Sequence, residues 1–183
     1  MNGATIYLTG ATASGKSALA MHLAKRLGGE IISVDSMQVY CGLNIGTAKP
    51  SAEEQAEVPH HLIDVAQLSE AFDAAQFVRL AKSASESILS RGRIPIFCGG
   101  TGLYFRALME GLGNSPPSDE LLRDELSLLP FESLVTELKI KDPKAAKQID
   151  LKNPRRVLRA VEVIRLTGRP YSEQRIGWDK LKR

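Results

Sequence analysis

The chain has 183 residues, of which 43% are hydrophobic and 25% are charged, proportions typical of a globular protein with a packed core. No stretch approaches the roughly 18 uninterrupted apolar residues of a membrane span, so we expect a cytoplasmic protein without membrane contact. Cys41 and Cys98 show no metal-ligand spacing, and we expect both thiols to be reduced. The net charge of +3 conceals an asymmetry. Residues 1–138 carry ten Lys and Arg against sixteen Asp and Glu, whereas residues 139–183 carry fourteen against five.

The first expected elements are a strand over 5–9, a phosphate-binding loop over 10–17 and a helix over 16–27. The loop reads GATASGKS and matches G-x-x-x-x-G-K-[ST] at every fixed position, between the strand and the helix that such a site requires. Its two fixed glycines allow the backbone to curl, so that N–H groups and the helix N-terminus face an anion. We expect Lys16 to neutralise the outer phosphate and the Ser17 hydroxyl to ligate Mg²⁺. The predicted diphosphate-binding residues are Gly10, Ala11, Thr12, Ala13, Ser14, Gly15, Lys16 and Ser17.

A carboxylate follows the second expected strand, which covers residues 30–34. Asp35 comes directly after this strand, and we expect it to lie beside the phosphate loop. In that position it can accept a proton from an incoming nucleophile or hold Mg²⁺ through water. A plain cap of the strand end is the third interpretation that the residues leave open.

Two further strands are expected over 61–65 and 94–98, and two helices over 73–90 and 102–111. The alternation predicts an α/β fold, a P-loop NTPase-like parallel sheet flanked by helices, with ligands at the carboxyl ends of the strands. A P-loop ATPase places an acidic residue at the end of a later apolar strand. Here Gly-Gly-Thr at 99–101 takes that place, which argues against simple nucleotide hydrolysis and favours close approach of a large substrate.

The character of the chain changes after residue 113. Residues 114–118 (NSPPS) indicate a linker, so we divide the chain into a phosphate-binding core, 1–113, and a mainly helical part, 114–183. Asn153-Pro154 predicts the start of one helix and Gly168 its end. A basic part attached to an acidic core either grips a polyanion or forms a solubilising surface, and the charges alone leave both open.

Six blocks of the chain resemble bacterial tRNA dimethylallyltransferases: GATASGKS (10–17), VDSMQVY (34–40), IGTAKP (45–50), VPHHLID (58–64), GRIPIFCGGTGLYFRAL (92–108) and NPRRVLRAVEV (153–163). The resemblance runs from residue 5 to about residue 175. It implies a P-loop-like core that binds dimethylallyl diphosphate rather than ATP, and an inserted helical domain that grips the anticodon stem-loop of tRNA. The implied reaction transfers the dimethylallyl group to N6 of the adenosine 3′-adjacent to the anticodon, in tRNAs that read codons starting with U.

The resemblance also implies roles for single residues. Asp35 falls on the general base that takes the proton from N6, while Thr12 and Lys16 lie at the reacting carbon and the leaving diphosphate. Ala11 replaces a proline common in the family, a change that we expect to be tolerated. Mg²⁺ at Ser17 is the implied cofactor, and we expect a monomer. The residues implied to contact tRNA are Asp35, Ser36, Met37, Gln38, Thr101, Arg123, Arg155, Arg156, Val157, Leu158 and Arg159. Family members continue well beyond residue 183, so the resemblance implies that the chain lacks their C-terminal part.

Three other functions remain open at this point. A small-molecule P-loop kinase would use the same loop and carboxylate, together with an arginine-rich lid over ATP. An adenylate isopentenyltransferase shares the diphosphate chemistry but should lack an RNA-gripping part, and the basic residues 139–183 weigh against it. A protein that binds RNA without catalysis is the third.

Overall fold

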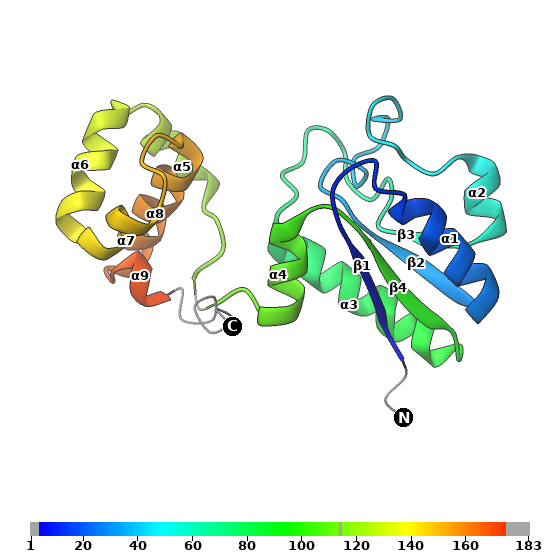
Figure 1. Ribbon diagram of the computed structural model, residues 1–183. Coiled ribbons are helices and arrows are strands. Elements are labelled where there is room, and N and C mark those ends of the chain that lie inside the picture. The colour runs from blue at the N-terminus through cyan, green and yellow to red at the C-terminus, as the bar shows by residue number, and fades with distance from the viewer. Residues whose placement is uncertain (1–3, 114, 175–183) are drawn as a thin grey trace. The chain divides into compact units, whose positions relative to one another are not determined.

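The computed structural model describes residues 4–113 and 115–174, and the chain packs as two units, 1–109 and 110–183 (Figure 1). The described part of the first unit contains a parallel sheet of four strands flanked by helices, which confirms the expected fold class. The strands are β1 (Ile6–Thr9), β2 (Gly29–Val34), β3 (His60–His61) and β4 (Ile94–Gly99).

The order of the strands across the sheet is β1-β4-β2-β3, so β4 lies between β1 and β2 (Figure 1). The register places Gly99 opposite both Thr9 and Val34. The chain therefore leaves β1, β4 and β2 at one edge of the sheet. Asp35 follows β2 at the same edge as the phosphate loop, as expected, but β4 lies between β2 and the strand that precedes the loop.

The strand expected over 61–65 is much shorter than the pattern suggests, and β3 ends at His61. Leu62 and Asp64 both have left-handed backbones, with φ of 62° and 54°. A strand cannot continue through such residues because they turn the chain sharply. The sequence gives no sign of this turn, because the left-handed positions are occupied by leucine and aspartate rather than by glycine.

Helices cover both faces of the sheet. Alternate residues of β2 and β4 pack on opposite sides: Ile31 and Ile96 contact the cluster around α1 (Lys16–Leu27), whereas Ile32 and Phe97 contact the cluster around α3 (Ala74–Ser90). The remaining helices of this part are α2 (Ala52–Glu57) and α4 (Gly102–Glu110). Of these helices α2 is the one not expected, although its capping box, Ser51 with Glu54, is a signal of a helix start.

The described part of the second unit is helical, without a strand, as the sequence predicts. Asn153 caps α8 by accepting a hydrogen bond from the Arg156 N–H, and Gly168 ends it in a left-handed conformation. Buried leucine, valine and alanine side chains from several helices form one apolar core. The helices are α5 (Glu120–Ser127), α6 (Phe131–Lys141), α7 (Pro143–Gln148), α8 (Pro154–Thr167) and α9 (Tyr171–Gln174). Within the described residues, no helix is long and apolar enough to span a membrane.

Candidate functional site

The phosphate loop between β1 and α1 curls through two left-handed residues, Ala13 with φ of 63° and Gly15 with φ of 79°. Gly10 has no positive φ, so the expectation that both glycines supply the curl is wrong for Gly10. Gly10 instead leaves room for the Ser14 side chain, because a Cβ at Gly10 would lie 3.3 Å from the Ser14 hydroxyl oxygen. The Ala11 carbonyl accepts the Ser14 N–H at 3.3 Å and closes the turn.

The open end of α1 faces this loop. Gly15 is the N-cap residue, so no side chain caps the helix, and its first turn contains no acidic residue. The first N–H groups of a helix lack partners within it and attract anions, with help from the helix dipole. Lys16 bends back over the loop, where its Nζ donates to the Ala11 carbonyl at 2.5 Å and to Ser14 Oγ at 3.4 Å. Thr12 and Ser17 are exposed on the loop. The arrangement suits an anion with several oxygens.

Two glycines lie between this loop and Asp35 at the edge of the sheet. A Cβ at Gly99 would lie 2.1 Å from the Val34 carbonyl oxygen, and one at Gly100 would lie 3.6 Å from the Gly10 carbonyl oxygen. The ends of β1, β4 and β2 therefore approach one another closely. Gly99 at the end of β4 and Gly100 directly after it carry no side chains, so the backbone between the loop and the carboxylate stays open.

Asp35 caps the turn that follows β2. Its Oδ1 accepts the N–H groups of Met37 at 2.8 Å and Gln38 at 3.3 Å. Thr101 tightens the same corner, because its hydroxyl oxygen accepts the Ser36 N–H at 3.0 Å and its own N–H donates to the Val34 carbonyl at 3.2 Å. The interpretation of Asp35 as a cap is therefore correct. The cap uses one carboxylate oxygen and fixes the orientation of the side chain, while the other oxygen has no role in the cap. Oδ2 is the oxygen that can take a proton.

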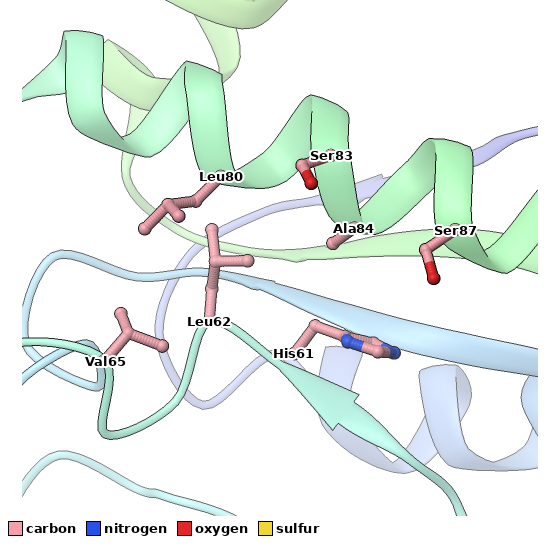
Figure 2. A pocket seen from close by; sticks show the side chains of 7 residues that line it. All are labelled: His61, Leu62, Val65, Leu80, Ser83, Ala84 and Ser87. Atoms are coloured by element: carbon pink, nitrogen blue, oxygen red, sulfur yellow. The ribbon is translucent and has the colours of Figure 1, made fainter.

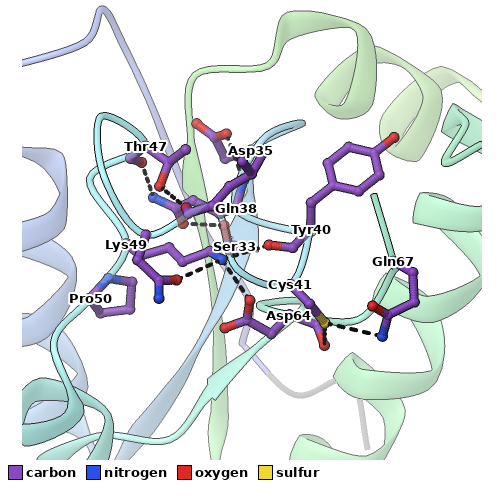
Figure 3. A network of polar contacts seen from close by, with 12 residues as sticks. Ser33, Asp35, Gln38, Tyr40, Cys41, Thr47, Lys49, Pro50, Asp64 and Gln67 are labelled. Atoms are coloured by element: carbon purple, nitrogen blue, oxygen red, sulfur yellow. Dashed lines mark hydrogen bonds and ion pairs between the residues drawn. The ribbon is translucent and has the colours of Figure 1, made fainter. Parts of the chain in front are cut away.

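Gln38 anchors the segment that follows this turn (Figure 3). Its Oε1 accepts the Ser33 hydroxyl at 2.8 Å, and its Nε2 donates to the carbonyls of Thr47 at 3.0 Å and Ala48 at 2.9 Å. All three contacts are internal, so the structure gives Gln38 a positioning role and leaves its implied contact with tRNA untested. Met37 beside it is 49% exposed and is available to a ligand.

Lys49, for which the sequence predicts no role, holds the same segment from the other side (Figure 3). Its side chain is only 5% exposed, and its Nζ donates to the Tyr40 carbonyl and to Asp64 Oδ1, both at 2.6 Å. A buried lysine is rare unless it is paired. The signal is present in the IGTAKP and VPHHLID blocks, which supply Lys49 and Asp64, but nothing in the sequence connects them.

The residues expected to contact RNA in the second unit differ in their surroundings. Arg155 and Arg156 are exposed in the first turn of α8. Val157 is completely buried in the apolar core and Leu158 packs against that core, so an RNA contact by the Val157 side chain is excluded. Arg123 and Arg159 pair with one carboxylate, that of Glu162.

Magnesium is expected at the loop rather than at a cluster of protein ligands. The described residues contain no group of three or more His, Cys, Asp or Glu that could hold a metal ion. The hydroxyl of Ser17 and the carboxylate of Asp35 are oxygen donors of the kind that Mg²⁺ prefers, and phosphates would supply the rest. The residues present therefore fit an ion that arrives with its anion.

A separate cavity of about 320 Å³ lies between β3 and α3 (Figure 2). His61 lies at its wall, and the His61 Nε2 is 2.6 Å from Glu30 Oε2. Burial favours the protonated form of Glu30, but hydrogen bonds from His61 and Arg91 outweigh it and hold the pKa of Glu30 below its usual value. None of the predicted site residues lines this cavity. Its lining residues are His61, Leu62, Val65, Leu80, Ser83, Ala84 and Ser87.

The fold and the loop together define a P-loop α/β protein, in which the loop and the carboxylate of Asp35 follow strands that end at the same edge of the sheet. Residues 38–181 match the IPP transferase family, and the chain belongs to this family. A protein from Halorhodospira halophila named tRNA dimethylallyltransferase is 48% identical over 177 residues, which cover 94% of this chain and 57% of that protein.

Solved structures agree with this assignment. A tRNA isopentenylpyrophosphate transferase from Bacillus halodurans is 47% identical with a TM-score of 0.59, covering 91% of this chain and 57% of that one. A eukaryotic dimethylallyltransferase acting on tRNA is 30% identical with a TM-score of 0.75, covering 95% of this chain and 46% of that one. The chain therefore spans about half the length of the relatives that it matches.

Proposed function

We propose that this chain transfers the dimethylallyl group of dimethylallyl diphosphate to N6 of the adenosine 3′-adjacent to the anticodon, in tRNAs that read codons starting with U. The observation that carries the proposal is the shared sheet edge, where the Gly99-Gly100 backbone separates the phosphate loop from Asp35. Relatives named tRNA dimethylallyltransferase support the choice of donor and acceptor.

The loop residues would stabilise the leaving group. When diphosphate departs from an allylic carbon, negative charge grows on the leaving oxygens. The N–H groups at the start of α1 would meet that charge, and the ammonium of Lys16 would exchange its contacts with Ala11 and Ser14 for the phosphate oxygens. Mg²⁺ bound with the diphosphate would add further neutralisation, with Ser17 as its protein ligand. Thr12 is exposed on the same loop and would contact the reacting carbon in this proposal.

Asp35 would serve the acceptor. N6 of adenine is a poor nucleophile because its lone pair is delocalised into the ring, so removal of its proton assists the attack. Oδ1 is held by two backbone N–H groups, which directs the proton to Oδ2. The target base must leave its stack to reach this position. Met37 and the turn held by Thr101 offer the surface on which it would rest.

The second unit would hold the RNA. Residues 139–183 have nine more Lys and Arg than Asp and Glu, and Arg155 and Arg156 present their charges to solvent. Neutralisation of phosphates by such side chains is the main source of affinity for nucleic acids. We include in the proposal a cytoplasmic, monomeric protein with Mg²⁺ as its cofactor.

Competition between acceptors tests the proposal. The purified chain is incubated with Mg²⁺ and labelled dimethylallyl diphosphate in the presence of tRNA, AMP and ATP, and each acceptor is separated and counted. Label in tRNA, abolished in the Lys16→Ala variant, is the expected result. Label in AMP or ATP would identify an adenylate isopentenyltransferase instead, and binding of tRNA without any transfer would reduce the function to RNA binding.

A further inference from the structure

The second unit contains a carboxylate that is completely enclosed. Glu162, on α8, is 0% exposed, and each of its oxygens accepts two hydrogen bonds. Oε1 accepts the Asp119 N–H at 2.8 Å and Arg123 Nε at 3.0 Å. Oε2 accepts Arg159 Nη1 at 2.7 Å and Arg123 Nη2 at 3.2 Å. One buried acid therefore organises two arginines from different helices.

Stability alone does not account for this arrangement. Replacing a buried ion pair or triad by apolar residues of similar volume often leaves a protein equally stable or more stable, because burying charges is costly. What the acid does achieve is control of the arginines. The side chains of Arg123 and Arg159 are 40% and 26% exposed, so part of each reaches the surface while its guanidinium group is fixed by the acid.

Arg159 is held from a second direction as well. Its Nη2 donates to the Pro116 carbonyl at 2.5 Å, while its Nη1 is bound by Glu162. A guanidinium held at both ends has little rotational freedom left to lose when it binds a ligand. Preorganised groups of this kind bind more tightly than free side chains, because the ordering entropy has been lost before binding.

We propose that Glu162 is a positioning residue for RNA, which sets the guanidinium groups of Arg123 and Arg159 side by side so that both contact the phosphate backbone. This inference rests on the proposed function. It predicts a behaviour opposite to that expected from net charge. Removing a negative charge should strengthen the binding of a polyanion if charge alone decides, whereas loss of the positioning acid should weaken it.

The test compares Glu162→Gln with the parent chain. A labelled RNA corresponding to an anticodon stem-loop is titrated at several salt concentrations, and the dissociation constant and its salt dependence are measured. We expect the affinity to fall about tenfold, the loss of roughly one charge-assisted hydrogen bond. The slope of log K against log salt should flatten by about 0.7–0.9 for each phosphate that the arginines no longer neutralise.

Glu137→Gln is the matched control. Glu137 lies in the same unit, accepts both Nε and Nη2 of Arg165 at 3.1 and 2.7 Å, and also pairs with Lys141 at 3.0 Å. The substitution makes the same charge change and breaks the same kind of arginine fork. Because Arg165 is not among the residues expected to contact RNA, this variant should bind RNA as tightly as the parent or slightly more tightly.

A second variant keeps the test valid if Glu162→Gln does not fold, as judged by circular dichroism. Arg123→Lys preserves the net charge and alters a partly exposed side chain, but lysine cannot form the two-pronged contact with Glu162. It should also weaken RNA binding. Parent-like binding by a folded Glu162→Gln, or by Arg123→Lys, would overturn the inference and leave the proposed function intact. Absence of RNA binding by the parent would overturn both.

Discussion

The two oxygens of Asp35 have different tasks in the proposed function, and this makes one substitution unusually informative. In Asp35→Asn the amide oxygen can still accept the N–H groups of Met37 and Gln38, so the turn should persist. The variant loses its proton acceptor but keeps the phosphate loop. We expect single-turnover prenyl transfer to fall by about 10²–10⁴, with dimethylallyl diphosphate binding nearly unchanged by calorimetry. Retention of more than roughly a tenth of the parental rate would show that Asp35 is not the base.

The glycine pair at the end of β4 offers a second comparison between single residues. A Cβ at Gly99 would lie 2.1 Å from the Val34 carbonyl oxygen, which is backbone and cannot move aside easily. Gly99→Ala should therefore lower the free energy of unfolding by about 3 kcal/mol, the upper part of the range for overpacked sites. Gly100→Ala is the control, because its Cβ would lie 3.6 Å from the Gly10 carbonyl oxygen, an ordinary contact. Equal urea midpoints for the two variants would contradict this account.

At the scale of elements, α8 presents two exposed arginines at its capped N-terminus. Replacing Arg155 and Arg156 together by Gln should reduce the slope of log K against log salt for RNA by about 0.7–0.9 per phosphate that they neutralise. The fold should be unaffected, because the cap is made by Asn153 and the core by other residues. Arg79 and Lys82, exposed on α3, provide a double substitution of equal charge as the control. Equal salt-dependence slopes in the two double variants would mean that the arginines of α8 face solvent without contacting RNA phosphates.

Local signals explain which elements could be predicted from the sequence. The helix expected over 16–27 has those bounds, and Asp73 and Asn153 cap α3 and α8 as expected, because caps act within one turn of chain. The order of strands across the sheet has no such local signal, so the sequence does not reveal the insertion of β4 between β1 and β2. The same holds for buried polar contacts between distant segments, such as Lys49 with Asp64.

The candidate site divides in the same way. The phosphate loop and Asp35 can be found from sequence because motif and strand pattern are contiguous. The roles of Gln38 and Glu162 depend on partners from other turns and helices, which no spacing reveals. Val157 is part of a basic block in the sequence, although its spacing on α8 places it in the core.

At the scale of the whole molecule, stability should decrease as the pH falls. Burial lowers the pKa of His60 below its usual value of 6.5, so the unfolded chain binds this proton more readily and stability is lost below about pH 6.5. The pKa values of Glu30 and Glu137 lie below their usual value of 4.5, so stability from these groups is present above pH 4.5 and is lost below it. The free energy of unfolding, measured with urea at pH 7, 5.5 and 4, should fall in two stages, first through His60 and then through the two glutamates.

His60→Gln separates the two stages. The variant should lose most of the change between pH 7 and 5.5 while keeping the change below pH 4.5. His22, which is exposed on α1, provides His22→Gln as the matched substitution at a solvent-accessible histidine. A parent whose urea midpoint is the same at pH 7 and pH 5.5 would rule out the contribution of His60.

The central place of β4 has a consequence for synthesis on the ribosome. The phosphate loop and Asp35 are translated within the first 35 residues, but their strands are joined only by β4, which ends at Gly99. The early chain therefore carries the phosphate loop and Asp35 without the sheet that brings them to one edge. Long-range pairing of this kind forms late, because the ends of a long loop must first meet. We therefore expect the phosphate loop and Asp35 to come together only after β4 has emerged from the ribosome and has paired with both β1 and β2.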